Sequence, residues 1–358
     1  MKGSYHIRVE NKRLRHDLDI RRNITIIRGD SATGKTTLIE MLQSAEKDGT
    51  ASGVSLSCDK PCVVLDRIRW EENLEMIHNS IVFLDEQNHF MESKEFAVKI
   101  RESDNYYVLI TRAYLSNLPY SVDEIYGIRE SGKYLHLNKS YHELYRIYED
   151  RFMQSQPDCM MTEDSNSGFE FFRHLFSDYM ECLSASGKSN LYQKILNSGK
   201  RKSCLVIADG AAFGPEMERI VSLARHGYRL LLFLPESFEW IVLKAGIIKD
   251  RQIEDILECP ENYIESSRYF SWERFFTDLL TQETRNTYLR YTKSHLNPVY
   301  LQDHEKQKIV DMLPEQIRCI VKEEEGCCIF ILEAWLMKYM TLKPISKISM
   351  RMPGLRRI

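Results

Sequence analysis

The sequence predicts an α/β protein that contains two parallel sheets and ends in a small helical region. Three observations support this fold class. Short apolar runs alternate with amphipathic helical patterns over residues 1–153, the same alternation returns in residues 154–248, and only helical spacing remains in residues 249–358. A chain of 358 residues is also long enough for two or three domains. We therefore expect three regions with these boundaries.

The clearest motif lies at residues 29–36, which read GDSATGKT and match the phosphate-binding pattern G-x-x-x-x-G-K-[ST]. Residues 23–28 before it predict a buried strand, and residues 37–42 after it predict a helix. The motif therefore lies at a strand-to-helix turn, where backbone N–H groups and the helix dipole bind phosphate. A glycine-rich turn that matches the pattern by chance is the alternative.

The residue types in this loop have separate roles in binding a nucleoside triphosphate. Gly29 and Gly34 let the backbone curl around the phosphates. Lys35 can reach the β- and γ-phosphates, where it would also act in hydrolysis, and the hydroxyl of Thr36 can bind Mg²⁺. The expected nucleotide contacts come from Gly29, Asp30, Ser31, Ala32, Thr33, Gly34, Lys35, Thr36 and Thr37.

A second motif predicts hydrolysis as well as binding. Residues 81–84 form an apolar run typical of a central parallel strand, and the run ends in Asp85 and Glu86. This is the Walker B pattern, in which Asp85 would hold Mg²⁺ through water and Glu86 would orient or deprotonate the attacking water. Without the phosphate-binding loop upstream, an acidic pair here would equally indicate a loop start or a helix cap.

The other elements of the first region complete a compact α/β unit of the P-loop NTPase type. Hairpin strands are expected at 5–9 and 15–20, further strands at 63–65 and 107–110, and helices at 70–78 and 93–101. The last strand ends at Thr111 and Arg112, on the side of a parallel sheet where ligands bind. Arg112 is expected either to sense the γ-phosphate or to be an exposed loop arginine.

The choice of nucleotide follows from a missing carboxylate. A GTPase needs the guanine-reading pattern N-K-x-D, and the nearest string here, residues 138–141, ends in Tyr141 instead of an aspartate. We therefore expect ATP with Mg²⁺.

An ABC-type ATPase would carry an LSGGQ-like signature between Thr50 and Ile81, and none is present. A homo-oligomer is compatible with this site, because a neighbouring arginine often completes P-loop sites.

Composition and charge exclude several classes of protein. The net charge of −3 gives no overall attraction to nucleic acid, and 43% hydrophobic with 28% charged residues suits a folded core with a soluble surface. No apolar run reaches the length of a membrane span, and residues 1–6 have no signal-peptide core. The nine cysteines form neither a zinc pattern nor a disulfide framework. A cytoplasmic protein without membrane contact is therefore expected.

The second region predicts another parallel sheet with acidic residues at its strand ends. Strands are expected at 159–162, 181–184, 203–208 and 229–234, with helices at 169–179, 191–196 and 215–225. Glu163, Asp209, Glu236 and Glu239 follow strand ends that meet in one crevice. Their mutual repulsion favours a site for Mg²⁺ or Mn²⁺, which suits phosphoryl transfer. The alternative is a set of separate solvated acids, with Glu236 and Glu239 in a helix first turn.

This order of residues resembles a Toprim domain. Behind a P-loop ATPase it resembles the OLD (overcoming lysogenization defect) family of ATPase-Toprim nucleases and related phage-defence proteins. The resemblance implies that Glu163 acts in acid/base or metal chemistry, that Asp209 holds metal, and that Glu236 or Glu239 is the remaining ligand. Ala211 stands where the usual Asp-x-Asp pattern has its second aspartate. The ABC signature and the long coiled-coil insertion of typical OLD enzymes are also absent.

In the last region apolar residues recur at helical spacing over 253–257, 272–280, 306–321 and 329–340, with breaks near Pro260, Pro298, Pro314 and Gly326. A basic tail follows at 343–358. The tail would contact nucleic-acid phosphates or form a solvated terminus. The expected function is an ATPase that controls a metal-dependent nuclease or phosphodiesterase acting on DNA or RNA, in phage defence or mobile-element biology. The alternatives are an ATP-dependent switch, or a motor, whose Toprim-like domain is catalytically inactive.

Overall fold

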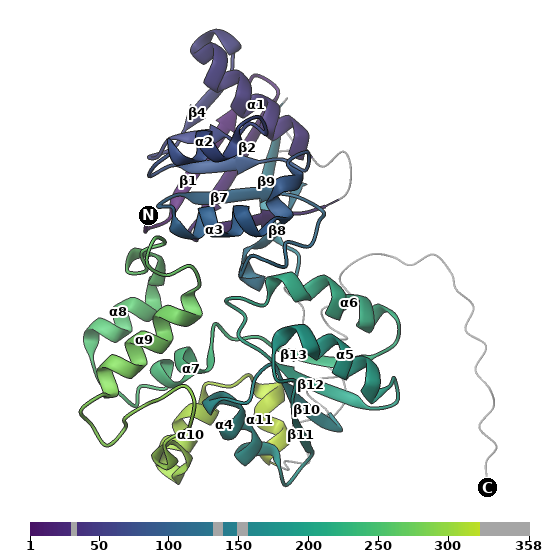
Figure 1. Ribbon diagram of the computed structural model, residues 1–358, viewed down its shortest axis with the longest axis vertical. Helices are drawn as coiled ribbons and strands as arrows, with labels where there is room; N and C mark the ends of the chain where they lie inside the picture. The colour runs from purple at the N-terminus through teal and green to yellow at the C-terminus, as the bar shows by residue number, and fades with distance from the viewer. Residues whose placement is uncertain (30–33, 132–138, 149–156, 323–358) are drawn as a thin grey trace, which may run out of the picture.

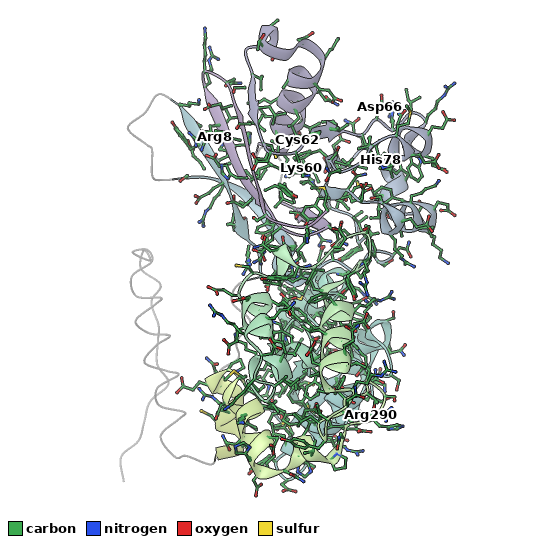
Figure 2. The ribbon with its side chains drawn as sticks, turned by 90° about the vertical axis from the view of Figure 1, so that its left-hand side faces the viewer. Arg8, Lys60, Cys62, Asp66, His78 and Arg290 are labelled. Atoms are coloured by element: carbon green, nitrogen blue, oxygen red, sulfur yellow. The ribbon has the colours of Figure 1, made fainter. Side chains whose placement is uncertain are left out.

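The computed structural model describes residues 1–29, 34–131, 139–148 and 157–322. It contains two separate sheets, one of nine strands and one of four. Figure 1 shows the larger sheet at the top, the smaller sheet at the lower right and helices beside it at the lower left. Figure 2, turned by 90°, shows the same two halves, with Arg8, Cys62 and His78 in the upper half and Arg290 in the lower.

The larger sheet has the strand order β4-β1-β2-β9-β8-β3-β7-β6-β5 and is mostly parallel. Its antiparallel pairs are β1 with β2, β1 with β4, and β8 with β9, so the predicted N-terminal hairpin is confirmed. The strands are β1 (Tyr5–Glu10), β2 (Leu14–Ile20), β3 (Ile24–Ile27), β4 (Ser55–Ser57), β5 (Cys62–Val64), β6 (Ile81–Leu84), β7 (Tyr106–Ile110), β8 (Ile125–Glu130) and β9 (Ser140–Arg146).

Every residue of the central strands β3, β6 and β7 is buried, because helices cover both faces of the sheet. Alternate residues face opposite ways: Ile27 and Phe83 pack with helix α1 (Lys35–Asp48), whereas Ile26 and Val82 pack with helix α3 (Lys94–Glu102). The remaining helix of this half, α2, spans Trp70–Glu75 and ends three residues before the expected boundary at residue 78.

The smaller sheet confirms the predicted second parallel sheet. Its order is β11-β10-β12-β13, and all of its neighbouring strands are parallel. The strands are β10 (Cys159–Thr162), β11 (Glu181–Ser184), β12 (Ser203–Ile207) and β13 (Arg229–Phe233). The connecting helices are α4 (Ser167–Phe176), α5 (Lys188–Ser198) and α6 (Met217–Arg225), the last preceded by a 3₁₀ turn at Gly214–Glu216. Because β10 and β12 are parallel neighbours, their carboxyl ends lie side by side.

The regular elements between β13 and residue 322 are helices, joined by turns and loops. They include α7 (Phe238–Lys244), α8 (Arg251–Glu258), α9 (Trp272–Thr284), α10 (Asp303–Asp311) and α11 (Glu315–Lys322). The helical pattern expected at 306–321 forms two helices, α10 and α11, which are divided at the break expected near Pro314. The predicted helix at 329–340 and the basic tail lie outside the described residues. Among the helices that the structure describes, none is long and apolar enough to cross a membrane.

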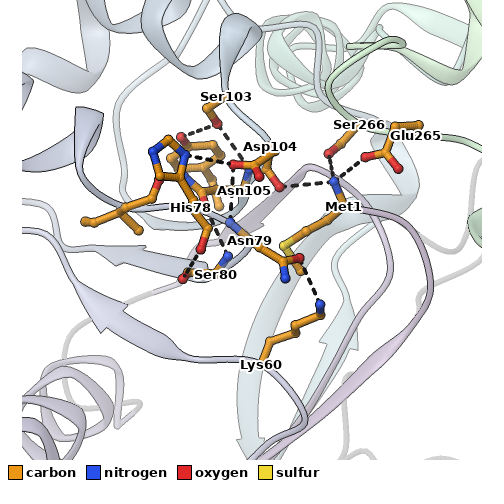
Figure 3. A network of polar contacts seen from close by, with 12 residues as sticks. Met1, Lys60, His78, Asn79, Ser80, Ser103, Asp104, Asn105, Glu265 and Ser266 are labelled. Atoms are coloured by element: carbon orange, nitrogen blue, oxygen red, sulfur yellow. Dashed lines mark hydrogen bonds and ion pairs between the residues drawn. The ribbon is translucent and has the colours of Figure 1, made fainter.

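The two halves share a packed boundary. One cluster of buried residues continues from the larger sheet through Tyr120 and Val122 to Phe213 and Met217 in the second half. A polar network adds to it (Figure 3): the backbone nitrogen of Met1 donates to the Asp104 carbonyl oxygen at 3.0 Å and to Ser266 Oγ at 2.8 Å. The same nitrogen forms an ion pair with Glu265. The halves are therefore joined by both apolar and polar contacts.

Candidate functional site

The phosphate-binding motif lies between β3 and α1, as predicted. Gly29 and Gly34 both have positive φ angles, 136° and 85°, and Gly34 caps the N-terminus of α1. The side chain of Lys35 is buried, and its Nζ donates to the carbonyl oxygen of Gly29 at 2.8 Å. Thr36 is exposed in the first turn of α1. Lys35 therefore spans the loop from its last residues back to its first, while Asp30, Ser31, Ala32 and Thr33 lie outside the described residues.

Asp85 and Glu86 lie at the same edge of the larger sheet as the phosphate-binding motif. Strand β7 lies between β3 and β6, so Thr111, at the end of β7, stands between the loop and Asp85. Oδ1 of Asp85 accepts hydrogen bonds from the backbone N–H of Gln87 at 3.1 Å and from the side chain of Asn88 at 3.0 Å. These bonds fix the carboxylate that is predicted to hold Mg²⁺.

Glu86 and Arg112 form an ion pair, with Nε of Arg112 3.4 Å from Oε2 of Glu86. Both side chains are about half exposed and line a hollow of about 230 Å³ together with Thr111 and Asn88. The proposed water-orienting carboxylate and the proposed γ-phosphate sensor are thus brought into contact. Arg112 is thus both exposed and paired with Glu86, which is compatible with either interpretation of this residue.

Two histidines that the sequence patterns do not identify pack against the loop. His16 on β2 lies opposite His142 on β9, with their rings edge to face and 4.8 Å apart. A Cβ atom at Gly34 would lie 2.6 Å from Nδ1 of His142, so only glycine fits there. Both ring nitrogens of His16 are buried, with no hydrogen-bond partner among the residues that the structure describes. Burial, followed by the neighbouring His142, lowers the pKa of His16 to about 4.

This buried imidazole predicts a loss of stability in acid. The unfolded chain takes up a proton at this residue near pH 6.5, whereas the folded protein does so only near pH 4. The contribution of His16 is therefore complete above pH 6.5 and is lost as the pH falls, by up to about 3 kcal/mol. In urea unfolding between pH 8 and pH 4, His16→Leu should flatten this acid decline, and the same change at the exposed His174 should not. Equal declines in all three proteins would contradict the assignment.

The second half gathers carboxylates at the carboxyl ends of β10 and β12. Glu163 follows β10, Asp209 follows β12, and Glu239 lies in the first turn of α7, where Ser237 Oγ caps the helix by accepting from the N–H of Trp240 at 3.2 Å. Asp209 and Glu239 have side-chain exposures of only 15% and 2%. Three of the predicted acids are thus brought to one largely buried centre.

The ammonium of Lys293 stands among these acids. Its Nζ lies 2.5 Å from Oε1 of Glu273, 3.7 Å from Oδ2 of Asp209 and 3.9 Å from Oε1 of Glu239. Burial lowers the pKa of Lys293, but the charges of Asp209, Glu239 and Glu273 together raise it by more than burial lowers it. The net change in this pKa is therefore upward. Lys293 is therefore held in its charged form as an internal counter-ion.

The carboxyl groups of this centre also raise one another's pKa values. Burial, then the charges of Glu273 and Glu163, raise the pKa of Asp209 well above its usual value, against the opposing effect of Lys293. Burial, then Glu273, raise the pKa of Glu163 to about 7. Carboxyl groups with raised pKa values in one cluster are a property of sites that bind cations or move protons.

Glu236, the fourth predicted acid, is placed differently. Its carboxylate pairs with Arg22, whose Nη1 donates to Oε2 of Glu236 at 3.0 Å. Arg22 belongs to the larger sheet's half, immediately before β3. Of the two glutamates after β13, Glu239 therefore lies in the acidic centre with Asp209, whereas Glu236 lies at the boundary between the halves.

Three residues of this centre could not have been found from the strand pattern. Glu273 and Lys293 come from the helical region, and so does Tyr291, whose hydroxyl donates to Oε1 of Glu239 at 2.7 Å. The sequence offered no local signal for them, because they lie in or after α9, far along the chain from Asp209. Only the packing of the helical region against the smaller sheet brings them there.

The donor set suits a divalent cation chemically. Within the described part of the chain, Oε2 of Glu239 is buried without a hydrogen-bond partner. Glu163, Asp164 and Asp209, but not Glu239, line a hollow of about 30 Å³, enough for one small ion or water. As the side chains stand in the described residues, however, no three His, Cys, Asp or Glu groups are close enough to hold a metal ion. A cation bound here would have to take over the neutralising role of Lys293.

Comparison with known proteins does not identify the chain: no family model matches it, and no curated protein sequence matches it. The functional argument therefore depends on the geometry of the two sites.

Proposed function

We propose that this protein binds and hydrolyses ATP, and that its ATPase half controls a Toprim-like, metal-dependent nuclease or phosphodiesterase centre in the second half. The observation that carries the proposal is the buried cluster of Glu163, Asp209 and Glu239 at the strand ends of a parallel sheet. Such a cluster is unfavourable without a cation, and oxygen donors favour Mg²⁺ or Mn²⁺. By resemblance, the setting would be phage defence or mobile-element biology in the cytoplasm.

The ATPase part rests on the loop geometry. Positive φ angles at Gly29 and Gly34 open the backbone toward a ligand, and Lys35 is held across the loop by the Gly29 carbonyl oxygen. Thr36 and the hydrogen-bonded Asp85 would hold Mg²⁺, and Glu86 beside Arg112 would orient the attacking water.

In the second half, a bound divalent cation would activate water and stabilise the charge that develops on a phosphate. Asp209, Glu163 and Glu239 would hold it. Tyr291 orients Glu239 through its hydrogen bond. Lys293 supplies one positive charge among these acids in the metal-free protein, and its ammonium could then pair with the phosphate of a DNA or RNA backbone.

The test is cleavage of supercoiled plasmid and of single-stranded RNA with Mg²⁺ or Mn²⁺, with and without ATP. The parent protein should cut one of these substrates, and Asp209→Ala should lose at least about a hundredfold of the rate. Glu181→Ala is the matched control, because Glu181 is an exposed acid at the opposite end of the same sheet. Equal cutting by parent and Asp209→Ala would exclude this centre as the nuclease.

Two observations favour a second candidate, an ATP-driven switch that binds without cleaving. Ala211 replaces the second aspartate of the Asp-x-Asp pattern, and the ammonium of Lys293 already stands beside Asp209 and Glu239, where a cation would bind. Under this alternative the protein hydrolyses ATP but cuts neither substrate with either metal. The same cleavage assay, run beside phosphate release from ATP, therefore separates the two functions.

A further inference from the structure

A short segment connects the nucleotide side of the larger sheet to the acidic centre of the smaller one. We call residues 113–124 the bridging segment; it begins directly after Thr111 and Arg112. It meets residues 209–218, here called the Asp209 segment, through two backbone hydrogen bonds. The N–H of Val122 donates to the Gly210 carbonyl oxygen at 2.9 Å, and the N–H of Gly214 donates to the Tyr120 carbonyl oxygen at 2.9 Å. Asp209 is thus one residue from a backbone bond to the ATPase half.

The side chain of Arg28 forms hydrogen bonds to both segments, next to the phosphate-binding loop. It precedes Gly29, and its Nη2 donates to the carbonyl oxygen of Ala113 at 3.2 Å and to the hydroxyl of Tyr120 at 3.1 Å. Its Nη1 donates to Oε2 of Glu218 on α6 at 2.7 Å. One side chain, 7% exposed, therefore touches the bridging segment and the second half while its backbone begins the loop.

The contact is closely packed as well as hydrogen-bonded. A Cβ atom on Gly214 would lie 2.3 Å from Cδ2 of Tyr120 and 2.6 Å from its carbonyl oxygen. Tyr120 and Phe213 are 1% and 0% exposed and belong to the same buried cluster as Met217 on α6. Because these residues are closely packed without voids, a displacement of the bridging segment must displace the Asp209 segment or break this contact.

We infer that this joint, with Arg28 as its positioning residue, couples the nucleotide state of the ATPase half to the acidic centre. Thr111 and Arg112 would respond to the γ-phosphate, and the bridging segment that follows them would carry the change to Asp209. The inference rests on the proposed binding of ATP. It adds the route of regulation, and by linkage a ligand at Asp209 must change nucleotide affinity by the same factor.

Hydrogen–deuterium exchange on the full chain tests the coupling, with Mg²⁺ and a non-hydrolysable ATP analogue. We expect slower exchange in peptides covering the loop near residues 29–36 and a several-fold change in exchange at residues 209–218. Residues 251–258 of α8, whose Ile253 and Ile256 pack in the buried cluster that does not include Tyr120 and Phe213, should not change. Protection of the loop with no change at residues 209–218 would overturn the inference while leaving ATP binding intact. Absence of protection at the loop would instead remove the proposed nucleotide site, and the inference with it.

Two variants assign the coupling to these residues. Glu218→Gln removes the charged partner of Arg28 from the second half, at a side chain that is 42% exposed and so should still fold. Gly214→Ala places a methyl group against Tyr120. Each should keep nucleotide protection at the loop but reduce the response at residues 209–218 by roughly fivefold or more, whereas Glu181→Gln should not. A full response in folded Glu218→Gln and Gly214→Ala proteins would refute the joint.

Discussion

Replacing Arg22 by Met is expected to destabilise the protein by about 3–5 kcal/mol, because it leaves two buried carboxylates without their shared cation. Arg22 is 3% exposed and lies between Glu124, which is 0% exposed, and Glu236, which is 15% exposed. Its guanidinium also lies 3.5 Å from the ring centre of Trp272. Burial raises the pKa of Glu124 and the charge of Arg22 is the largest effect that opposes the rise, so without Arg22 only Arg21 and Arg146 offset the cost of burying this carboxylate.

The measurement is the urea midpoint followed by the fluorescence of the four tryptophans, one of which is Trp272. Arg21→Met is the matched control: Nε of Arg21 donates to the same Glu124 at 3.0 Å, but from a side chain that is 32% exposed. Arg22→Lys should fall between the parent and Arg22→Met, since lysine keeps the charge but loses the planar fork and the stacking. Adding Glu124→Gln and Glu236→Gln to Arg22→Met should recover part of the loss. A smaller effect for Arg22→Met than for Arg21→Met would contradict this account.

Lys35→Ala is expected to lower ATP turnover by at least about 10²–10³-fold, the usual cost of removing one positioned charge from a transition state. The ammonium of Lys35 already lies across the loop against Gly29, where it would meet the β- and γ-phosphates. Phosphate release under saturating ATP and Mg²⁺ measures the effect. Lys47→Ala, an exposed lysine in the last turn of the same helix, is the control and should retain activity. Turnover that survives Lys35→Ala would remove Lys35 from the mechanism.

The sequence predicted best the elements whose information is local. The strand before residue 29, the acidic strand end at Asp85 and the second parallel sheet all appear where periodicity and motif spacing put them. Strands β8 and β9 were not predicted. Residues 140–146 read SYHELYR, in which polar residues follow one another without a strict alternation, so only pairing with β2 and β8 makes the strand.

The acidic centre was predictable only in part, for the same reason. Strand ends placed Glu163 and Asp209 together, because parallel neighbours share one edge. The separation of Glu236 from Glu239 depends on Arg22, more than two hundred residues earlier in the chain. Lys293 likewise reaches the acids only through tertiary packing. Contacts between residues so far apart leave no periodic trace in a single sequence.

The position of β8 and β9 in the larger sheet has a consequence for the order in which the protein folds. These two strands, from residues 125–146, lie between β2 and β3, so they join two groups of strands that come earlier in the chain. Until they emerge from the ribosome, β4-β1-β2 and β3-β7-β6-β5 are separate sheets with unpaired edges, and α1 has to bridge them. Such late, non-local closure slows folding and exposes strand edges to aggregation. A chain cut between β7 and β8 should therefore accumulate as insoluble material rather than as a smaller nucleotide-binding domain.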